Sequence, residues 1–206
     1  MRTSRIVFTL LIGWAISCML QAQKNIGDYF VDMPLNLIPT LESSYRLELV
    51  ENYRTSGKDT VQNMFGTSVK LLSLDTINQH INVKTTANSR FEMLLFRQNN
   101  DTVIGIIYTV CAPVCSSYIH FYDSQWKKKA YSFPAYDITH WLKAANSPEE
   151  NKLVKDLVKA DFIELSFNPK EQAVEVRNNS LEYLSEEENK MIENRVEEKV
   201  IYFSLR

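Results

Sequence analysis

Residues that interrupt regular secondary structure are scarce in this chain. Its 206 residues include only five glycines and six prolines, with no low-complexity tract and no block of like charges. Such a composition argues against long disordered segments. No repeat occurs at the periods that are typical of solenoid proteins. We therefore expect a folded, globular chain.

Motifs that mark common catalytic and metal sites are also missing. The chain has no glycine-rich phosphate loop and no Gly-x-Ser-x-Gly nucleophile motif. Its three histidines form no His-x-x-x-His or His–Glu pair that would indicate a zinc site. The carboxylates Glu149–Glu150 and Glu186–Glu188 lie where helices are predicted to begin, and free helix amides explain them. We assign no catalytic residue, no metal and no cofactor.

An excess of basic charge is missing as well. The formal net charge is −2, and removing the first 22 residues, which hold Arg2 and Arg5, leaves 21 basic and 25 acidic residues. The remaining chain therefore carries a net charge of −4. This mild acidity argues against nucleic acid as a partner, since such proteins present a basic face.

The first 22 residues have the pattern of a signal peptide. Arg2 and Arg5 precede an apolar stretch, 6–16, and a small residue, Ala22, ends the segment. The apolar stretch is about half of the roughly 20 residues that a membrane-spanning helix needs. We expect cleavage after Ala22, which leaves a single domain at 24–206 with no transmembrane segment. The protein is then exported, and periplasmic or secreted.

A lipoprotein signal is the alternative. The run Ala15-Ile16-Ser17-Cys18 is similar to a lipobox, in which a small residue precedes a cysteine that becomes lipidated. In this case the signal ends before Cys18, and that residue carries a lipid anchor. The protein is then an outer-membrane lipoprotein.

The residues after the signal predict an α+β fold with an antiparallel β-meander. A short helical start precedes a better helix opened by Ser43 or Ser44 and ended by Gly57. From Asp59 the hydrophobic period changes to two, and short polar turns separate the strands, which favours antiparallel hairpins. The expected strands are 61–65, 69–74, 77–85, 89–97, 102–111 and 116–122. The strand at 102–111 is the most apolar, so we expect it to be central.

The second half of the chain adds helices and more strands. Ser147 and Ser185 each begin a capping-box pattern that predicts a helix. Further strands are expected at 162–167, 173–177 and 199–205. The whole chain is therefore predicted to hold roughly 7–9 strands and about three packed helices. The alternative places a boundary between halves at 24–126 and 127–206, but we favour one shared core.

Two closely spaced cysteines, Cys111 and Cys115, indicate a disulfide. In an oxidising compartment, a chain that keeps only these two thiols is expected to join them. A hairpin turn at Pro113 brings two Cα atoms within the roughly 4.4–6.8 Å that a disulfide needs. The alternative is thiol–disulfide exchange, although redox pairs of the thioredoxin kind have two intervening residues at a helix start.

An aromatic stretch follows the predicted meander and offers a candidate recognition surface. Aromatic rings bury contact area at low entropic cost and are enriched at interfaces. The alternative, which we favour, is that these rings pack the connecting segment against the sheet. The residues concerned are Tyr131, Phe133, Tyr136 and Trp141.

An Asp-Thr-aliphatic motif occurs three times, at Thr60, Thr76 and Thr102. It resembles the O-glycosylation signal on exported proteins of some Gram-negative anaerobes, so these threonines are modification candidates. The alternative is structural, because Asp and Thr suit the turn that leads into a strand.

The run Thr109-Val110-Cys111-Ala112-Pro113-Val114-Cys115, followed by Ile119-His120-Phe121-Tyr122, resembles the central signature of domain-of-unknown-function family 3256. Similarity extends from Met33-Pro34 to the closing strand. Members of that family are short exported proteins of Bacteroidales-type bacteria. The resemblance implies residence in the cell envelope and implies no catalytic residues.

These observations favour a non-enzymatic envelope protein that binds a protein, a peptide or a glycan. The alternative is a periplasmic enzyme, most concretely one that exchanges disulfides at Cys111 and Cys115. Stability and reactivity of that bridge would separate the two.

Overall fold

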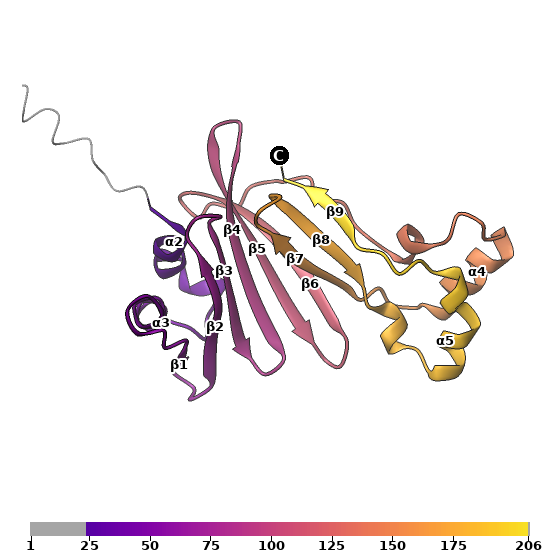
Figure 1. Ribbon diagram of the computed structural model, residues 1–206, viewed down its shortest axis with the longest axis horizontal. Helices are drawn as coiled ribbons and strands as arrows, with labels where there is room; N and C mark the ends of the chain where they lie inside the picture. The colour runs from indigo at the N-terminus through magenta and orange to yellow at the C-terminus, as the bar shows by residue number, and fades with distance from the viewer. Residues whose placement is uncertain (1–23, 206) are drawn as a thin grey trace, which may run out of the picture.

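The computed structural model describes residues 24–205. The predicted cleavage site after Ala22 and the lipidation candidate Cys18 lie outside the described residues. Four α-helices and nine β-strands occur in the described part of the chain (Figure 1). The predicted α+β class is confirmed.

The strands form two antiparallel sheets instead of one. Six consecutive strands make the larger sheet in sequence order, as short hairpin links require. They are β1 (Thr60–Gln62), β2 (Ser68–Asp75), β3 (His80–Thr86), β4 (Ser89–Gln98), β5 (Asp101–Cys111) and β6 (Cys115–Asp123). The smaller sheet, also in sequence order, consists of β7 (Ile163–Asn168), β8 (Ala173–Asn178) and β9 (Ile201–Ser204).

Local capping signals account for most of the helices. The α-helices are α2 (Ile26–Asp32), α3 (Ser43–Ser56), α4 (Pro148–Leu157) and α5 (Glu186–Ile192). Short 3-10 helices are η1 (Leu35–Leu37), η2 (Ile138–Trp141), η3 (Ser180–Tyr183) and η4 (Glu193–Arg195). Ser147 and Ser185 cap α4 and α5 in the predicted capping boxes. A third box, between Asn25 and Asp28, stabilises α2, where only a helical start was expected.

Helix α3 lacks a side-chain cap at its beginning. Ser43 or Ser44 was predicted to open it as a capping residue, but the helix already includes Ser43, and its N-cap residue is Glu42, whose side chain accepts no hydrogen bond from the first turn. Its first amides therefore have no acceptor from a capping side chain. At the other end, Gly57 has φ 71° and closes the helix in the left-handed conformation, as predicted.

Two strands are shorter than predicted, because a side chain forms a turn at one end of each. The strand expected at 77–85 begins only at His80, because the Asp75 carboxylate accepts hydrogen bonds from the amides two and three residues further on. Ile77 lies at this turn and is 90% exposed. Asn63 forms a similar side-chain turn and ends β1 early.

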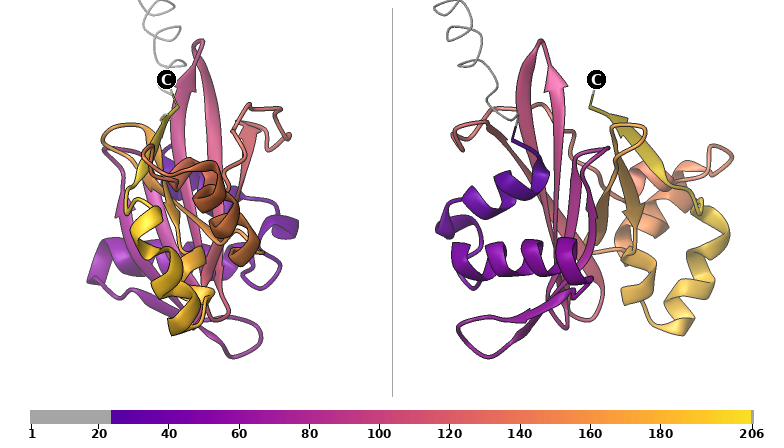
Figure 2. Two further views of the ribbon diagram at one scale, coloured as in Figure 1. Left: turned by 90° about the vertical axis from the view of Figure 1, so that its right-hand side faces the viewer. Right: turned by 60° about the vertical axis from the view of Figure 1, so that its left-hand side comes forward.

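Both faces of the larger sheet are covered, and each face has its own hydrophobic core. Helices α2 and α3 cover one face, here called the helical face (Figure 2). The smaller sheet, with α4 and α5 beyond it, covers the other face. Residues along β4 alternate between the two cores, with Phe91 and Met93 on the helical face and Leu94 and Phe96 on the other.

The prediction that the strand at 102–111 is central was wrong. This strand, β5, is the fifth of six and lies next to the edge. Its apolar composition has a different cause, since Ile104 and Ile106 belong to one core while Val103 and Ile107 belong to the other. A strand covered on both faces is apolar throughout, wherever it lies in the sheet.

One glycine allows the smaller sheet to approach the larger one. A Cβ atom at Gly105 in β5 would lie 2.9 Å from the ring of Phe167 in β7 and 3.4 Å from the ring of Phe121. Glycine inside a strand marks such a close approach. The Phe167 ring therefore packs directly against the backbone of Gly105, in the space that a side chain would occupy.

Candidate functional site

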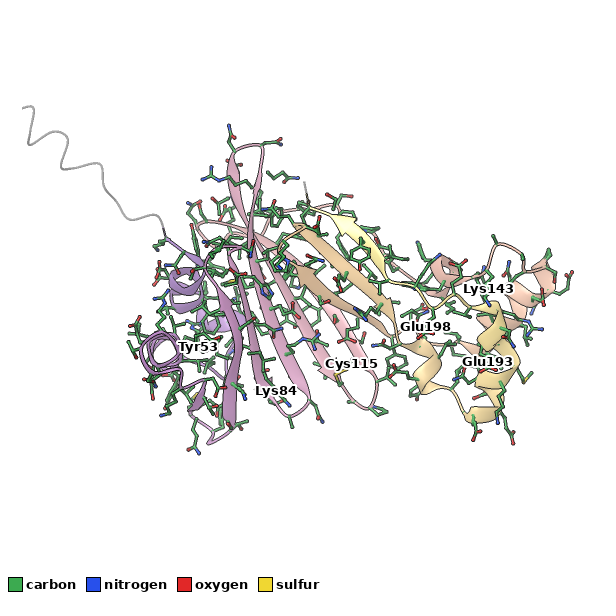
Figure 3. All side chains as sticks on the ribbon, viewed as in Figure 1. Tyr53, Lys84, Cys115, Lys143, Glu193 and Glu198 are labelled. Carbon is green, nitrogen blue, oxygen red and sulfur yellow. A yellow bond between two sulfur atoms is a disulfide. The ribbon has the colours of Figure 1, made fainter. Side chains whose placement is uncertain are left out.

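The structure joins Cys111 and Cys115 in a disulfide at the tip of the β5–β6 hairpin (Figure 3). The two residues are directly opposite each other across the hairpin. The Asn179 side chain donates a hydrogen bond to the carbonyl of Cys115 (3.3 Å). The two cysteines lie in a strand–turn–strand arrangement and not at the start of a helix, where thioredoxin-like pairs lie.

The three threonines of the Asp-Thr motif differ in accessibility. Thr60 lies in β1 and is half-buried, and its hydroxyl donates to Asp59 (2.8 Å). Thr102 is half-buried near the start of β5. Thr76 is exposed in the β2–β3 turn beside Ile77. Among the candidates for O-glycosylation, Thr76 therefore offers the most accessible hydroxyl.

Trp141, one of the four predicted recognition residues, belongs to a core. It is 1% exposed, and its indole N–H donates to the carbonyl of Lys199 (2.8 Å). Tyr136 packs against it, with ring centroids 6.3 Å apart, and is half-buried. Trp141 therefore offers almost no surface to a partner.

The other two predicted recognition residues fasten the connecting segment to both sheets. The Tyr131 ring stacks on Phe121 of the larger sheet at 4.1 Å. The Phe133 ring lies 5.0 Å from that of Phe203 in β9. These contacts agree with the alternative reading, in which the rings pack the connecting segment against the sheet.

A buried polar cluster lies where β7 crosses the larger sheet. Glu92 has 3% of its side chain exposed and accepts hydrogen bonds from Arg90 Nε (3.0 Å) and the Phe167 amide (3.1 Å). His80 Nε2 lies 3.4 Å from the same carboxylate. Arg90 also pairs with Glu164 in β7 (2.9 Å). These groups satisfy one another, and buried polar groups need such partners, so we interpret the cluster as structural.

The same contacts explain how an edge strand can be buried. Strand β7 is the outer strand of the smaller sheet, so alternate amides point away from β8. The Leu165 amide donates to the Ser117 hydroxyl (3.0 Å), and the next such amide, that of Phe167, donates to Glu92. The larger sheet thus supplies side-chain acceptors in place of a neighbouring strand.

Only part of the outer edge of β6 has hydrogen-bond partners for its backbone groups. The segment 127–129 pairs with the C-terminal part of β6. The Lys129 amide donates to the Phe121 carbonyl (2.8 Å), and the Asp123 amide donates to the Lys127 carbonyl (2.9 Å). The N–H and C=O groups of alternate residues point to the same side of a strand. Those of Ser117 and Ile119 therefore point away from β5, as those of Phe121 and Asp123 do. Within residues 24–205, no backbone group pairs with them. We call these four groups the open edge.

Aromatic side chains line the open edge on the helical face. The Tyr118 ring is 53% exposed and stacks on Tyr108 of β5 at 4.8 Å. His120, the next residue on that face, lies 5.4 Å from the same ring. The Tyr108 hydroxyl donates to the Leu37 carbonyl (3.0 Å), which fixes the position of the stack. Burial, with the charge of Lys128 acting in the same direction, lowers the pKa of His120, and a hydrogen bond with the Ile119 backbone opposes this shift. The lowered pKa favours the neutral ring at pH 7.

Two cavities lie away from the open edge. One of about 690 Å³ lies beside α5 at the far end of the molecule, where Figure 3 labels Glu193 and Glu198 in its lining. Another, of about 620 Å³, lies between the end of α2 and the start of α3. In residues 24–205 no cluster of three or more His, Cys, Asp and Glu side chains is placed to hold a metal. No helix in that range has the length and apolar character needed to cross a membrane.

The fold and the site define an α+β protein of two stacked antiparallel sheets with an open strand edge. Residues 17–204 match the family described as "Protein of unknown function (DUF3256)", and the chain belongs to that family. A solved structure titled "Structure of a domain of an uncharacterized protein from Porphyromonas gingivalis W83" is similar, with 18% identity and a TM-score of 0.76. The similarity covers 88% of this chain and 93% of that one and shows a common fold. No curated protein matches the chain.

Sequence reasoning did not find the open edge. Its residues, Ser117 and Ile119, lie in a strand that was predicted correctly, but no local pattern tells which strand ends a sheet. A weak signal was present, because residues 115–120 lack the lysine or proline that commonly protects an edge.

Proposed function

We propose that this protein is a non-enzymatic, exported binding module that takes up an extended peptide segment of a partner protein along the open edge of β6. The observation that carries the proposal is the half-filled edge. Segment 127–129 already pairs with the C-terminal part of β6, and the backbone groups of Ser117 and Ile119 continue the same line without a backbone partner. An extended peptide that adds to a free sheet edge gains main-chain hydrogen bonds in this way.

Side chains beside the open edge favour a peptide as the ligand. A strand added to β6 places alternate side chains on the two faces of the sheet. On the helical face its neighbours are Tyr118, which is 53% exposed, and the neutral His120. An aromatic side chain beside such a strand forms the cross-strand pairs that stabilise sheets.

The test begins with peptides selected from a random displayed library on the immobilised, disulfide-bonded protein. Selected peptides are then titrated into the ¹⁵N-labelled protein and followed by NMR. We expect the amide resonances of Ser117 and Ile119 to shift strongly and their hydrogen exchange to slow. A selection that yields peptides shifting other surfaces only, or no peptides, would overturn the proposal.

A single substitution isolates the open edge from the rest of β6. Ile119→Pro removes an N–H that points outward, together with a side chain that packs against the second core. Proline is tolerated on edge strands in that orientation, and the fold of the variant is checked by its NMR spectrum. We expect the substitution to abolish peptide binding. Ile119→Val keeps the N–H and serves as the matched control, with binding retained. Equal binding by the two variants would contradict an edge-pairing mode.

Export is the second part of the proposal, and the disulfide between Cys111 and Cys115 supports it, because such bonds persist in oxidising compartments. Intact mass of the protein from its native envelope tests it directly. We expect a mature chain cleaved after Ala22, or a lipid-bearing chain that begins at Cys18. Extra mass that maps to a peptide containing Thr76 would show glycosylation there. An uncleaved chain would refute export by either signal.

A further inference from the structure

An exposed lysine without an ion-pair partner lies next to the open edge of β6. Lys128 is bridged to Tyr122, so its side chain points to the helical face, where Tyr122 belongs to the core. The next residue, Lys129, points to the other face and pairs with Asp101 (3.6 Å). The ion pairs that lysines form within residues 24–205 involve other lysines, so Lys128 has no carboxylate partner there.

The charge of Lys128 reaches the open edge. His120 lies on the same face as Tyr122, two residues before it in β6. The ammonium of Lys128 contributes to lowering the pKa of His120, which means that the two side chains are close enough to interact. No carboxylate among the described residues acts on this ring in the opposite direction. The helical face of the open edge is therefore electropositive and has no acid of its own to compensate.

The segment that carries Lys128 leaves β6 before it reaches His120. Its last backbone hydrogen bond to β6 runs from the Lys129 amide to the Phe121 carbonyl. The chain then turns, because the Tyr131 ring stacks on Phe121, which belongs to the core on the other face. A peptide on the open edge continues the line of this segment and places a residue across from His120.

The direction of the open backbone groups determines how close the side chains come. In a peptide that runs antiparallel to β6, as segment 127–129 does, Ser117 and Ile119 form the hydrogen-bonded pairs. Tyr118 and His120 then form the other kind of pair, in which the Cα atoms are about 4.5 Å apart and the side chains are closer. The residue across from His120 also lies two positions from Lys128 along the same line, at about 7 Å, which a lysine side chain can span.

Given the peptide binding proposed above, on which this step rests, we propose that the bound peptide carries an acidic residue across from His120 and that Lys128 pairs with its carboxylate. Opposite charges that face each other on a sheet stabilise the pairing of strands, and like charges oppose it. Lys128 therefore selects acidic over neutral and basic peptides, while the backbone of Ser117 and Ile119 holds peptides of any sequence.

The probe is a peptide from the displayed library that shifts the amide resonances of Ser117 and Ile119. Its residue across from His120 is identified by the short Hα–Hα contact of a non-hydrogen-bonded pair. Three synthetic versions carry Glu, Gln or Lys at that position. We expect the Glu peptide to bind about two- to fivefold more tightly than the Gln peptide, as for other exposed ion pairs, and the Lys peptide to bind most weakly. High salt should reduce these differences, because it screens the charges.

Two lysine variants assign the preference to one side chain. Lys128→Gln should abolish the difference between the Glu and Gln peptides. Lys127→Gln removes the same charge from the adjacent exposed lysine, whose side chain points to the other face, and should retain the difference. Peptides that bind the edge with equal affinity whether they carry Glu or Gln would overturn the acidic preference alone. A difference that survives Lys128→Gln would overturn the role of this lysine. Absence of any peptide that shifts Ser117 and Ile119 would instead overturn the proposed function, and the acidic preference with it.

Discussion

Replacing Gly105 by alanine tests whether the two sheets are as closely stacked as the structure shows. The new Cβ would lie 2.9 Å from Cζ and 3.3 Å from Cε1 of Phe167. Carbon atoms pack best at about 3.5–4.0 Å, so the ring has to retreat by about 0.6–1.1 Å. Phe167 is 6% exposed and lies between the sheets, so its movement displaces β7 or its neighbours.

The size of the effect follows from two opposing contributions. Overpacking a core typically costs about 1–3 kcal/mol, while replacing a glycine inside a strand regains about 0.5–1 kcal/mol. We therefore expect Gly105→Ala to lower the free energy of unfolding by about 1–2 kcal/mol. A drop of this size is a large part of the stability of an ordinary domain.

A double-mutant cycle with Phe167→Leu assigns the cost to this one contact. Leucine lacks the ring atoms that the new Cβ would meet. In the Phe167→Leu background, Gly105→Ala should be neutral or slightly stabilising, which gives a coupling energy of about 1–2 kcal/mol. All four proteins are compared by urea unfolding without reductant, so that the Cys111–Cys115 disulfide stays intact in each. If Gly105→Ala costs the same in both backgrounds, Phe167 does not lie over Gly105 and the described stacking is wrong.

Three further predictions concern the buried cluster, the disulfide and the response to acid. Glu92→Gln removes the buried charge that pairs with the half-buried guanidinium of Arg90, and urea unfolding should show a loss of about 1–3 kcal/mol, while a change under about 0.5 kcal/mol would contradict the role of the cluster. Replacing Cys111 and Cys115 together by serine should cost about 2 kcal/mol, because the closed loop is short, and thiol titration of the native protein should find no free thiol in this pair. Hydrogen bonds from the Asn78 side chain and nearby amides lower the pKa of Asp75 from its ordinary 3.8, so its contribution to stability is present above pH 3.8 and is lost as pH falls through the folded value. Asp75→Asn should therefore flatten the acid side of the stability profile, and an unchanged profile would show that this carboxylate is not involved.

Much of the secondary structure could be predicted because its signals are local. The caps at Ser147 and Ser185 and the glycine after α3 each act within one helical turn. Short polar turns likewise determine antiparallel neighbours in a meander. Where the bounds of β1 and β3 differ from the prediction, a side chain forms a turn inside the expected strand. Asp75 delays β3, although Ile77 has the apolar character of a strand residue.

The stacking of the sheets and the open edge of β6 depend on contacts between distant residues. Glu92 and Phe167 are 75 positions apart, and no local pattern predicts that an amide of one sheet needs a carboxylate of the other. For the same reason Trp141 was a candidate for recognition, although in the structure it is buried and donates a hydrogen bond to Lys199, two residues before β9. Arg46 precedes Leu49 and Val50 by three and four residues, so it lies on the buried face of α3, although its side chain is charged.

The side-chain acceptors along β7 have a consequence for how the molecule opens. Outer strands of small sheets normally exchange their outward amide hydrogens within a short time, because water reaches them through brief local opening. Leu165 and Phe167 can release theirs only when Ser117 and Glu92 withdraw, which requires the sheets to separate. Their exchange should therefore be as slow as that of the innermost strands, so that two sheets with separate cores protect their amides as one cooperative unit.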